Sequence, residues 1–186
     1  MNVFFGCLLL LVSSNAFAGD AVVSLQAGID KVGSGGGAAI GGGASIGYAQ
    51  EISQKQALWL VTPEAAAYWH QGTTSQVTFM AGGRLAGAVW GQKDKQSKRS
   101  KRKVRGRDAY TNLIDVGPYA HVGVGALAAS TSQFSSPRLA MDGGAFADFT
   151  TKKLGITFGL QVQETVLLAN SSTPQDTILT GGLHVG

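Results

Sequence analysis

Apolar and polar residues alternate with a period of two through most of residues 19–186, and this alternation is typical of β-strands. Clusters of Gly, Ser, Thr, Asn and Pro interrupt the alternation and are typical of turns, for example at 33–36, 71–74, 135–137 and 170–174. The pattern predicts eight strands, at residues 21–30, 38–49, 57–70, 76–90, 113–128, 138–149, 154–168 and 177–185.

The two faces of the predicted strands differ in a way that indicates a membrane. The fifth strand has one unbroken apolar face, made of Ile114, Val116, Pro118, Ala120, Val122, Val124 and Ala126. The opposite faces carry mainly Gly, Ser, Thr and Gln with few charges, which is too little polarity for a surface in water. An apolar face of about 9–11 residues matches a tilted strand that crosses a bilayer. We therefore expect the apolar faces to point outward into lipid.

Two tryptophans mark the edges of the expected apolar band. Trp59 and Trp69 share the apolar face of the third predicted strand and lie ten residues apart. That spacing corresponds to about 33 Å along a strand and to about 25 Å vertically after a tilt of about 40°. Because outer-membrane barrels carry aromatic girdles at both edges of the hydrocarbon band, we predict that Trp59 and Trp69 belong to these girdles.

Composition agrees with a glycine-rich β protein of one domain. Charged residues are 14% of the 186 residues, and 27 residues are Gly; ordinary soluble domains have about 25% charged residues. Eight strands make the smallest common closed barrel, whose interior is filled by side chains. We expect inward-facing glycines to leave room there for larger polar residues.

The first 18 residues have the pattern of a secretory signal peptide. An apolar run at residues 3–12 is too short to span a bilayer as a helix and is followed by Ala16-Phe17-Ala18, after which we expect cleavage. Cys7, the only cysteine, lies inside this segment, so residues 19–186 hold no disulfide or thiolate site. No run of 18 apolar residues follows Ala18, so no transmembrane helix is expected.

Together, the signal peptide, the lack of cysteine and the eight alternating strands resemble the small outer-membrane β-barrels of Gram-negative bacteria, of the OmpA/OmpX type. The resemblance covers residues 19–186 and is one of architecture, without a family signature motif. It implies an all-β, antiparallel, up-and-down transmembrane barrel with a polar filled interior, exported to the periplasm and inserted in outer-membrane lipid. Such barrels usually end in an aromatic residue, whereas this sequence ends Leu183-His184-Val185-Gly186.

A strongly basic insert interrupts the pattern at residues 91–109. It holds nine of the chain's 15 Lys and Arg residues, namely Lys93, Lys95, Lys98, Arg99, Lys101, Arg102, Lys103, Arg105 and Arg107. We expect such a block to be a disordered loop that binds an anionic envelope component, or a solvated loop without a ligand. Specific nucleic-acid binding is less favoured because no aromatic residues are interleaved for base stacking. The strand count places this loop on the periplasmic side.

The inward charges form the candidate site. Glu64 and Arg84 sit on neighbouring predicted strands as close diagonal neighbours, and a charge inside a narrow barrel needs an opposite partner. We predict that they pair and that a polar network extends from them to Asp115, Tyr119, His121, Asp142 and Asp148. This network either only fills the lumen or closes a narrow pore.

No catalytic motif is present, and the spacing of His70, His121 and His184 does not suit a metal, so neither metal nor cofactor is expected. Three hypotheses remain. The first is a monomeric, non-enzymatic outer-membrane barrel with a structural, surface-interaction or narrow-pore role. The second is an outer-membrane lipid-modifying enzyme with His121 as general base. The third is a soluble secreted barrel that binds a small apolar ligand.

Overall fold

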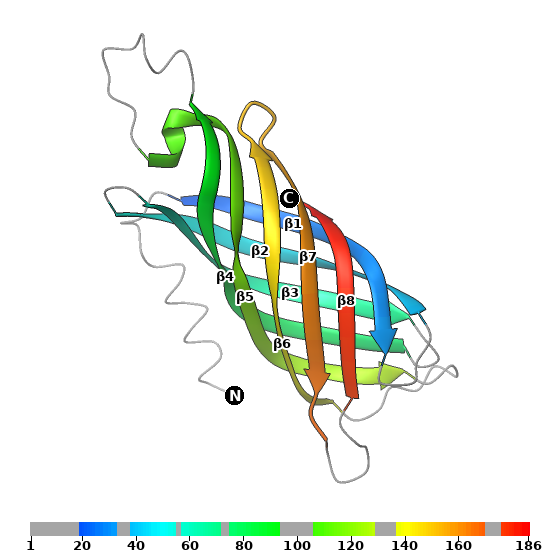
Figure 1. Ribbon diagram of the computed structural model, residues 1–186. Helices are drawn as coiled ribbons and strands as arrows, with labels where there is room; N and C mark the ends of the chain where they lie inside the picture. The colour runs from blue at the N-terminus through cyan, green and yellow to red at the C-terminus, as the bar shows by residue number, and fades with distance from the viewer. Residues whose placement is uncertain are drawn as a thin grey trace.

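The chain forms a closed barrel of eight antiparallel strands in chain order, in which β1 also pairs with β8 (Figure 1). The strands of this computed structural model are β1 (Gly19–Val32), β2 (Ala38–Gln54), β3 (Ala57–Gln71), β4 (Ser75–Lys93), β5 (Tyr110–Ala128), β6 (Arg138–Thr151), β7 (Ile156–Leu167) and β8 (Asp176–Val185). A short 3-10 helix, η1 (Gly106–Ala109), precedes β5. The structure describes residues 19–32, 38–54, 57–71, 75–93, 106–128, 137–169 and 176–186. The expected signal peptide and residues 94–105 of the basic insert lie outside these ranges.

All eight predicted strands are confirmed, and most extend a few residues beyond the predicted bounds. The seventh prediction starts two residues too early, because β7 begins at Ile156. Residues 152–155 form a tight turn in which the Gly155 N–H donates to the Lys152 carbonyl at 3.3 Å. Gly155 has a φ of 63°, a left-handed conformation that favours glycine, so the chain turns here rather than continuing as a strand.

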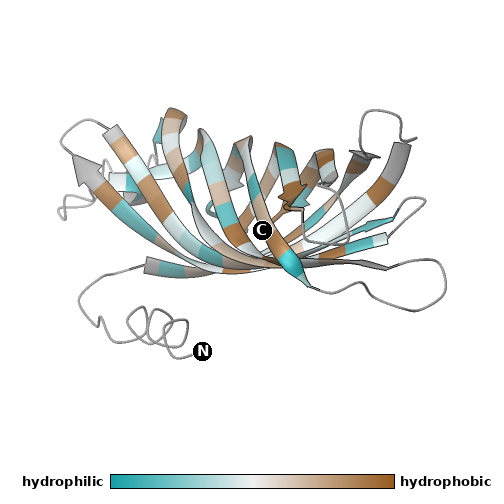
Figure 2. Ribbon diagram, turned by 90° about the horizontal axis from the view of Figure 1, so that it is seen from below, coloured by the Kyte–Doolittle hydropathy of each residue, from teal (hydrophilic) through white to brown (hydrophobic). Residues whose placement is uncertain are grey.

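The apolar faces point outward and the polar faces inward, as the alternation predicted. Figure 2 shows the alternation of hydrophobic and hydrophilic residues along the strands. Large apolar side chains such as Val23, Phe79 and Leu160 are about 60% exposed, whereas Gln163 and Thr165 inside the barrel are fully buried. Exposed apolar faces around a closed sheet fit surroundings of lipid, and the closed sheet leaves no unpaired edge in those surroundings. No helix in the described ranges is long and apolar enough to span a membrane.

Inward-facing glycines lie opposite the largest inward side chains. Gly82 on β4 is the register partner of His121 on β5, and Gly144 on β6 is the partner of Tyr119 on β5. A Cβ atom at Gly82 would come within 2.6 Å of the His121 Cα, and one at Gly144 would come within 2.8 Å of the Tyr119 hydroxyl. The missing side chains therefore make the space that the imidazole and phenol rings occupy.

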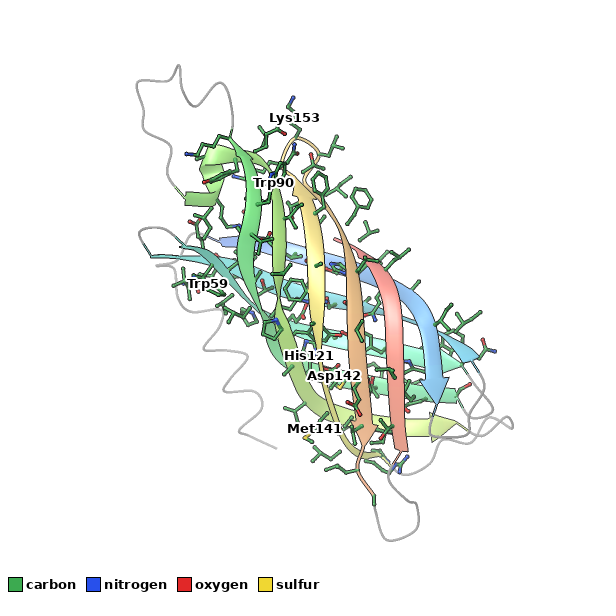
Figure 3. All side chains as sticks on the ribbon, in the orientation of Figure 1. Trp59, Trp90, His121, Met141, Asp142 and Lys153 are labelled. Carbon is green, nitrogen blue, oxygen red and sulfur yellow. The ribbon has the colours of Figure 1, made fainter. Side chains whose placement is uncertain are left out.

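The two ends of the barrel differ in their connections. We call the end at which β1 begins and β8 ends the terminal end; β2, β4 and β6 also end there, and β3, β5 and β7 begin there. Trp59 and Trp90 lie toward this end (Figure 3), and Trp69 lies at the other end of β3. All three are outward and between 41% and 50% exposed. The sequence pattern did not predict Trp90 as a girdle residue. It points outward because the register of β4 with β5 shifts between Ala88 and Trp90.

Candidate functional site

A hydrogen-bonded network of polar side chains crosses the middle of the lumen and is the candidate functional site. Its first link joins Arg84 on β4 to Glu64 on β3, where Arg84 Nε donates to Glu64 Oε1 at 2.7 Å. Arg84 pairs in register with Thr62, so it reaches Glu64 diagonally. From there Arg84 Nη2 donates to Gln161 Oε1 on β7 at 3.1 Å, which carries the network to the opposite wall.

His121 on β5 lies between two carboxylates. Its Nδ1 is 2.6 Å from Asp142 Oδ1, and its Nε2 is 2.9 Å from Glu64 Oε1. The side chains of His121 and Asp142 are completely buried, and Figure 3 shows them together inside the barrel. A neutral imidazole has one N–H, so both contacts are hydrogen bonds to carboxylates only when the ring is doubly protonated. In that form the two carboxylates are balanced by two cations, His121 and Arg84.

Two glutamines on β7 complete the network. Gln161 Nε2 donates to the Tyr119 hydroxyl at 3.2 Å, and Gln163 Nε2 donates to Asp142 Oδ2 at 2.9 Å. The guanidinium of Arg84 also lies 5.2 Å from the Tyr119 ring centroid, within the range of a cation–π contact. The central network therefore consists of Glu64, Arg84, Tyr119, His121, Asp142, Gln161 and Gln163. The two glutamines were missed because uncharged amides on an alternating strand carry no distinctive signal.

Two of the predicted network members lie elsewhere. Asp148 on β6 is paired with His184 on β8, with His184 Nε2 3.0 Å from Asp148 Oδ1. Asp115 on β5 is paired with Arg107, whose Nη1 and Nη2 donate to the two Asp115 oxygens at 2.7 and 2.5 Å. Both acids face the lumen, but each has a partner of its own nearer the terminal end.

The structure corrects the prediction for one residue of the basic insert. Arg107 was expected to lie on a loop that contacts anionic surfaces, but it is buried and bound to Asp115. Lys93, the first residue of the set, ends β4 and is exposed. The seven other predicted loop residues fall at 95–105, outside the described residues.

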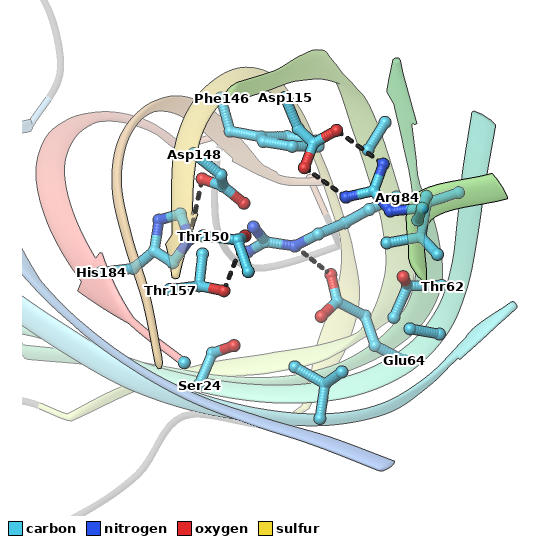
Figure 4. A pocket seen from close by; sticks show the side chains of 16 residues that line it. Ser24, Thr62, Glu64, Arg84, Asp115, Phe146, Asp148, Thr150, Thr157 and His184 are labelled. Atoms are coloured by element: carbon cyan, nitrogen blue, oxygen red, sulfur yellow. Dashed lines mark hydrogen bonds and ion pairs between the residues drawn. The ribbon is translucent and has the colours of Figure 1, made fainter. Parts of the chain in front are cut away.

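A small chamber separates the Arg107–Asp115 pair from the central network. It has a volume of about 90 Å³ and is lined by the Arg107–Asp115 and Arg84–Glu64 ion pairs and by hydroxyl groups (Figure 4). The hydroxyl-bearing residues are Ser24, Thr62, Thr150 and Thr157. Apolar side chains, among them Leu60 and Phe146, also line it. A space of this size that is lined in part by polar groups has room for several water molecules.

The three histidines of the chain, His70, His121 and His184, lie buried inside the barrel, away from its outer face. Within the described ranges, no group of three or more His, Cys, Asp or Glu residues comes together in a way that could hold a metal ion.

Comparison with known proteins identifies the fold. No protein-family model matches the chain, and no curated protein sequence matches it significantly. The chain is similar to the crystal structure of the outer membrane enzyme PagL, with a TM-score of 0.51 and 13% identity over 87% of this chain and 97% of that chain. It is also similar to the crystal structure of Neisserial surface protein A (NspA), with a TM-score of 0.49 and 12% identity over 89% and 97% of the two chains. The chain thus has the fold of the small eight-stranded outer-membrane β-barrels.

Proposed function

We propose that this protein is a non-enzymatic outer-membrane barrel with a closed lumen, which serves as a structural and surface-contact element of the cell envelope. The signal-peptide pattern of residues 1–18 and the outward apolar faces support export and insertion into the outer membrane. The proposal takes the protein to be a monomer surrounded by lipid.

The observation that carries the proposal is the central network. Side chains from five of the eight strands meet in it, and those of Glu64, Arg84 and His121 are at most 10% exposed. A passing solute would have to separate Arg84 from Glu64 in a medium of low dielectric constant, which is costly. A lumen closed in this way favours a structural role over an open pore.

The positions of the histidines favour a non-enzymatic role over lipid modification. A general base must come within hydrogen-bond reach of the proton that it removes from its substrate. His121 is enclosed by Glu64, Asp142 and the rings of Tyr68 and Tyr119, and a lipid on the outer face does not reach it. Similarity to PagL at 13% identity concerns the fold, so it does not transfer that enzyme's activity.

The contact role is assigned to the basic insert. Eight of its nine cations remain for binding once Arg107 is set aside. Lys153 on the 152–155 turn is exposed at the same end of the barrel and adds to the positive charge there. We propose that this end contacts an anionic component of the envelope, and that it faces the periplasm.

Conductance across a planar lipid membrane tests the closed lumen. The refolded wild-type protein should add no current above that of the bare membrane, while a general porin in the same membrane gives clear steps. Steady current steps from the wild-type protein would contradict the proposal. Arg84→Met should increase the current if the central network is the barrier.

Two further measurements test location and the lack of catalysis. Fractionated cells should retain the protein in the outer membrane until detergent is added, with a heat-dependent shift in gel mobility. Recovery without detergent would instead support the soluble barrel. The lipid profile of cells with and without the protein should be the same, and a deacylated or newly acylated lipid would support the enzyme.

A further inference from the structure

The segment that leads into β5 reaches across the mouth of the barrel at the terminal end. The Arg107 backbone N–H donates to both carboxylate oxygens of Glu51 on β2, at 3.2 and 3.1 Å. In the barrel order, β3 and β4 lie between β2 and β5. The segment Gly106–Ala109 therefore spans from one side of the mouth toward the other rather than following the rim.

The Arg107 side chain holds this segment down. Its two Nη atoms bind the two oxygens of Asp115 inside the lumen, and both residues are buried. A bidentate arginine–carboxylate pair is stronger and more directional than a single hydrogen bond. Arg107 is thus fixed to the barrel at two points, through its backbone to Glu51 and through its side chain to Asp115.

Gly106 adapts the backbone to this position. Its φ of 68° lies in the left-handed region, and a Cβ atom there would come within 2.9 Å of Glu51 Oε2. Glycine meets both requirements, a positive φ and a close approach to the carboxylate. The contact between the segment and β2 is therefore built into the local sequence.

We propose that Gly106–Ala109 is a lid over the chamber in the terminal half of the lumen. The chamber of about 90 Å³ lies between the Arg107–Asp115 pair and the central network, so opening of the lid should make it more accessible to water and small hydrophilic molecules from the terminal end. This goes beyond the proposed function, which requires closure only at the central network. The lid narrows the same lumen at a second level, nearer the terminal end.

Chemical labelling in the chamber tests the lid. Ser24 lines the chamber and is buried, and the chain without residues 1–18 holds no cysteine, so Ser24→Cys introduces a single thiol. The rate of reaction with a small methanethiosulfonate reagent is measured on the refolded barrel in vesicles. Arg107→Ala should raise this rate by about tenfold or more, because it frees the lid to open locally. Lys93→Ala, which removes an exposed cation from the same insert, should leave the rate unchanged.

A second variant separates lid opening from misfolding. Glu51→Gln weakens the contact with the Arg107 backbone but keeps the buried Arg107–Asp115 pair, so this barrel should fold and be labelled faster than wild type by a smaller factor. Folding of each variant is checked by its heat-dependent gel shift. Equal labelling rates in the wild-type, Lys93→Ala, Glu51→Gln and Arg107→Ala backgrounds would overturn the lid.

Discussion

Arg84 meets Glu64 diagonally across the β3–β4 pair, 2.7 Å from Nε to Oε1, and the same carboxylate oxygen also lies 2.9 Å from His121. One acid thus contacts two partners, a guanidinium and an imidazole, on two different strands. Its removal should therefore affect more of the lumen than a simple ion pair would.

We expect Glu64→Gln to destabilise the barrel by about 3–5 kcal/mol, because it leaves buried Arg84 without its carboxylate. The double variant Glu64→Gln with Arg84→Met should be less destabilised than Glu64→Gln alone, since no uncompensated guanidinium remains. Urea unfolding from lipid vesicles gives the four free energies of the double-mutant cycle. Additive effects would show that the two residues do not interact.

Val122→Arg should impair insertion or stability. Val122 is outward and 47% exposed near the middle of β5, and a basic residue at the bilayer midplane costs about 2–4 kcal/mol. The measurement is the free energy of folding into vesicles, with Val122→Leu as the matched apolar control. Wild-type stability of Val122→Arg would mean that this face does not contact lipid.

Substitution by alanine should affect stability differently at two adjacent glycines, Gly143 and Gly144. A Cβ at Gly144 would approach the Tyr119 hydroxyl to 2.8 Å and collide with the Val162 carbonyl oxygen, whereas one at Gly143 meets only the Tyr119 carbonyl oxygen, at 3.7 Å. We expect Gly144→Ala to cost about 1–3 kcal/mol, as overpacking does. Gly143→Ala should be close to neutral in the same unfolding assay, and equal effects would argue against the close fit of Gly144 to Tyr119.

Trypsin should cut within the basic insert and leave the barrel folded. The insert connects β4 to β5 and is rich in Lys and Arg, after which trypsin cleaves, and exposed connections are preferred cleavage sites. Because the Arg107 side chain is bound to Asp115, N-terminal sequencing should find the second fragment starting at or before Gly106. The heat-dependent gel shift of the nicked protein should persist.

The same digestion tests sidedness. Intact cells should be resistant, and cells with a permeabilised outer membrane should be cut, if the insert faces the periplasm. Cleavage in intact cells would reverse the assigned orientation without affecting the barrel.

The strands were predictable because lipid favours an apolar residue at every outward position, and this produces a clear period of two in the sequence. The Glu64–Arg84 contact was predictable as well, because few residues separate β3 from β4 and the register of the two strands is therefore restricted. The outward orientation of Trp90 was not predictable, because a shift of one residue in the β4–β5 register leaves no pattern in the local sequence.

Contacts between strands that are not neighbours could be identified only from the structure. His121 lies 57 residues from Glu64 in sequence, and they meet across β4, where both are register partners of Gly82, which has no side chain to separate them. Arg107 was misassigned for a different reason. In sequence it is one more cation in a charged run, and only the position of Asp115 inside the mouth of the barrel distinguishes it from the others.

The charges of the central network are also distributed in a way that bears on assembly. Glu64 and Arg84 belong to the hairpin β3–β4, and His121 and Asp142 are register partners in the hairpin β5–β6. Each hairpin therefore brings its acidic group into the bilayer together with a hydrogen-bonding partner on its other strand. Glu64 on β3 has Arg84 on β4, and Asp142 on β6 has His121 on β5. A single strand would expose a lone charge to hydrocarbon, so the hairpin is the smallest unit that can enter the membrane with these groups already paired.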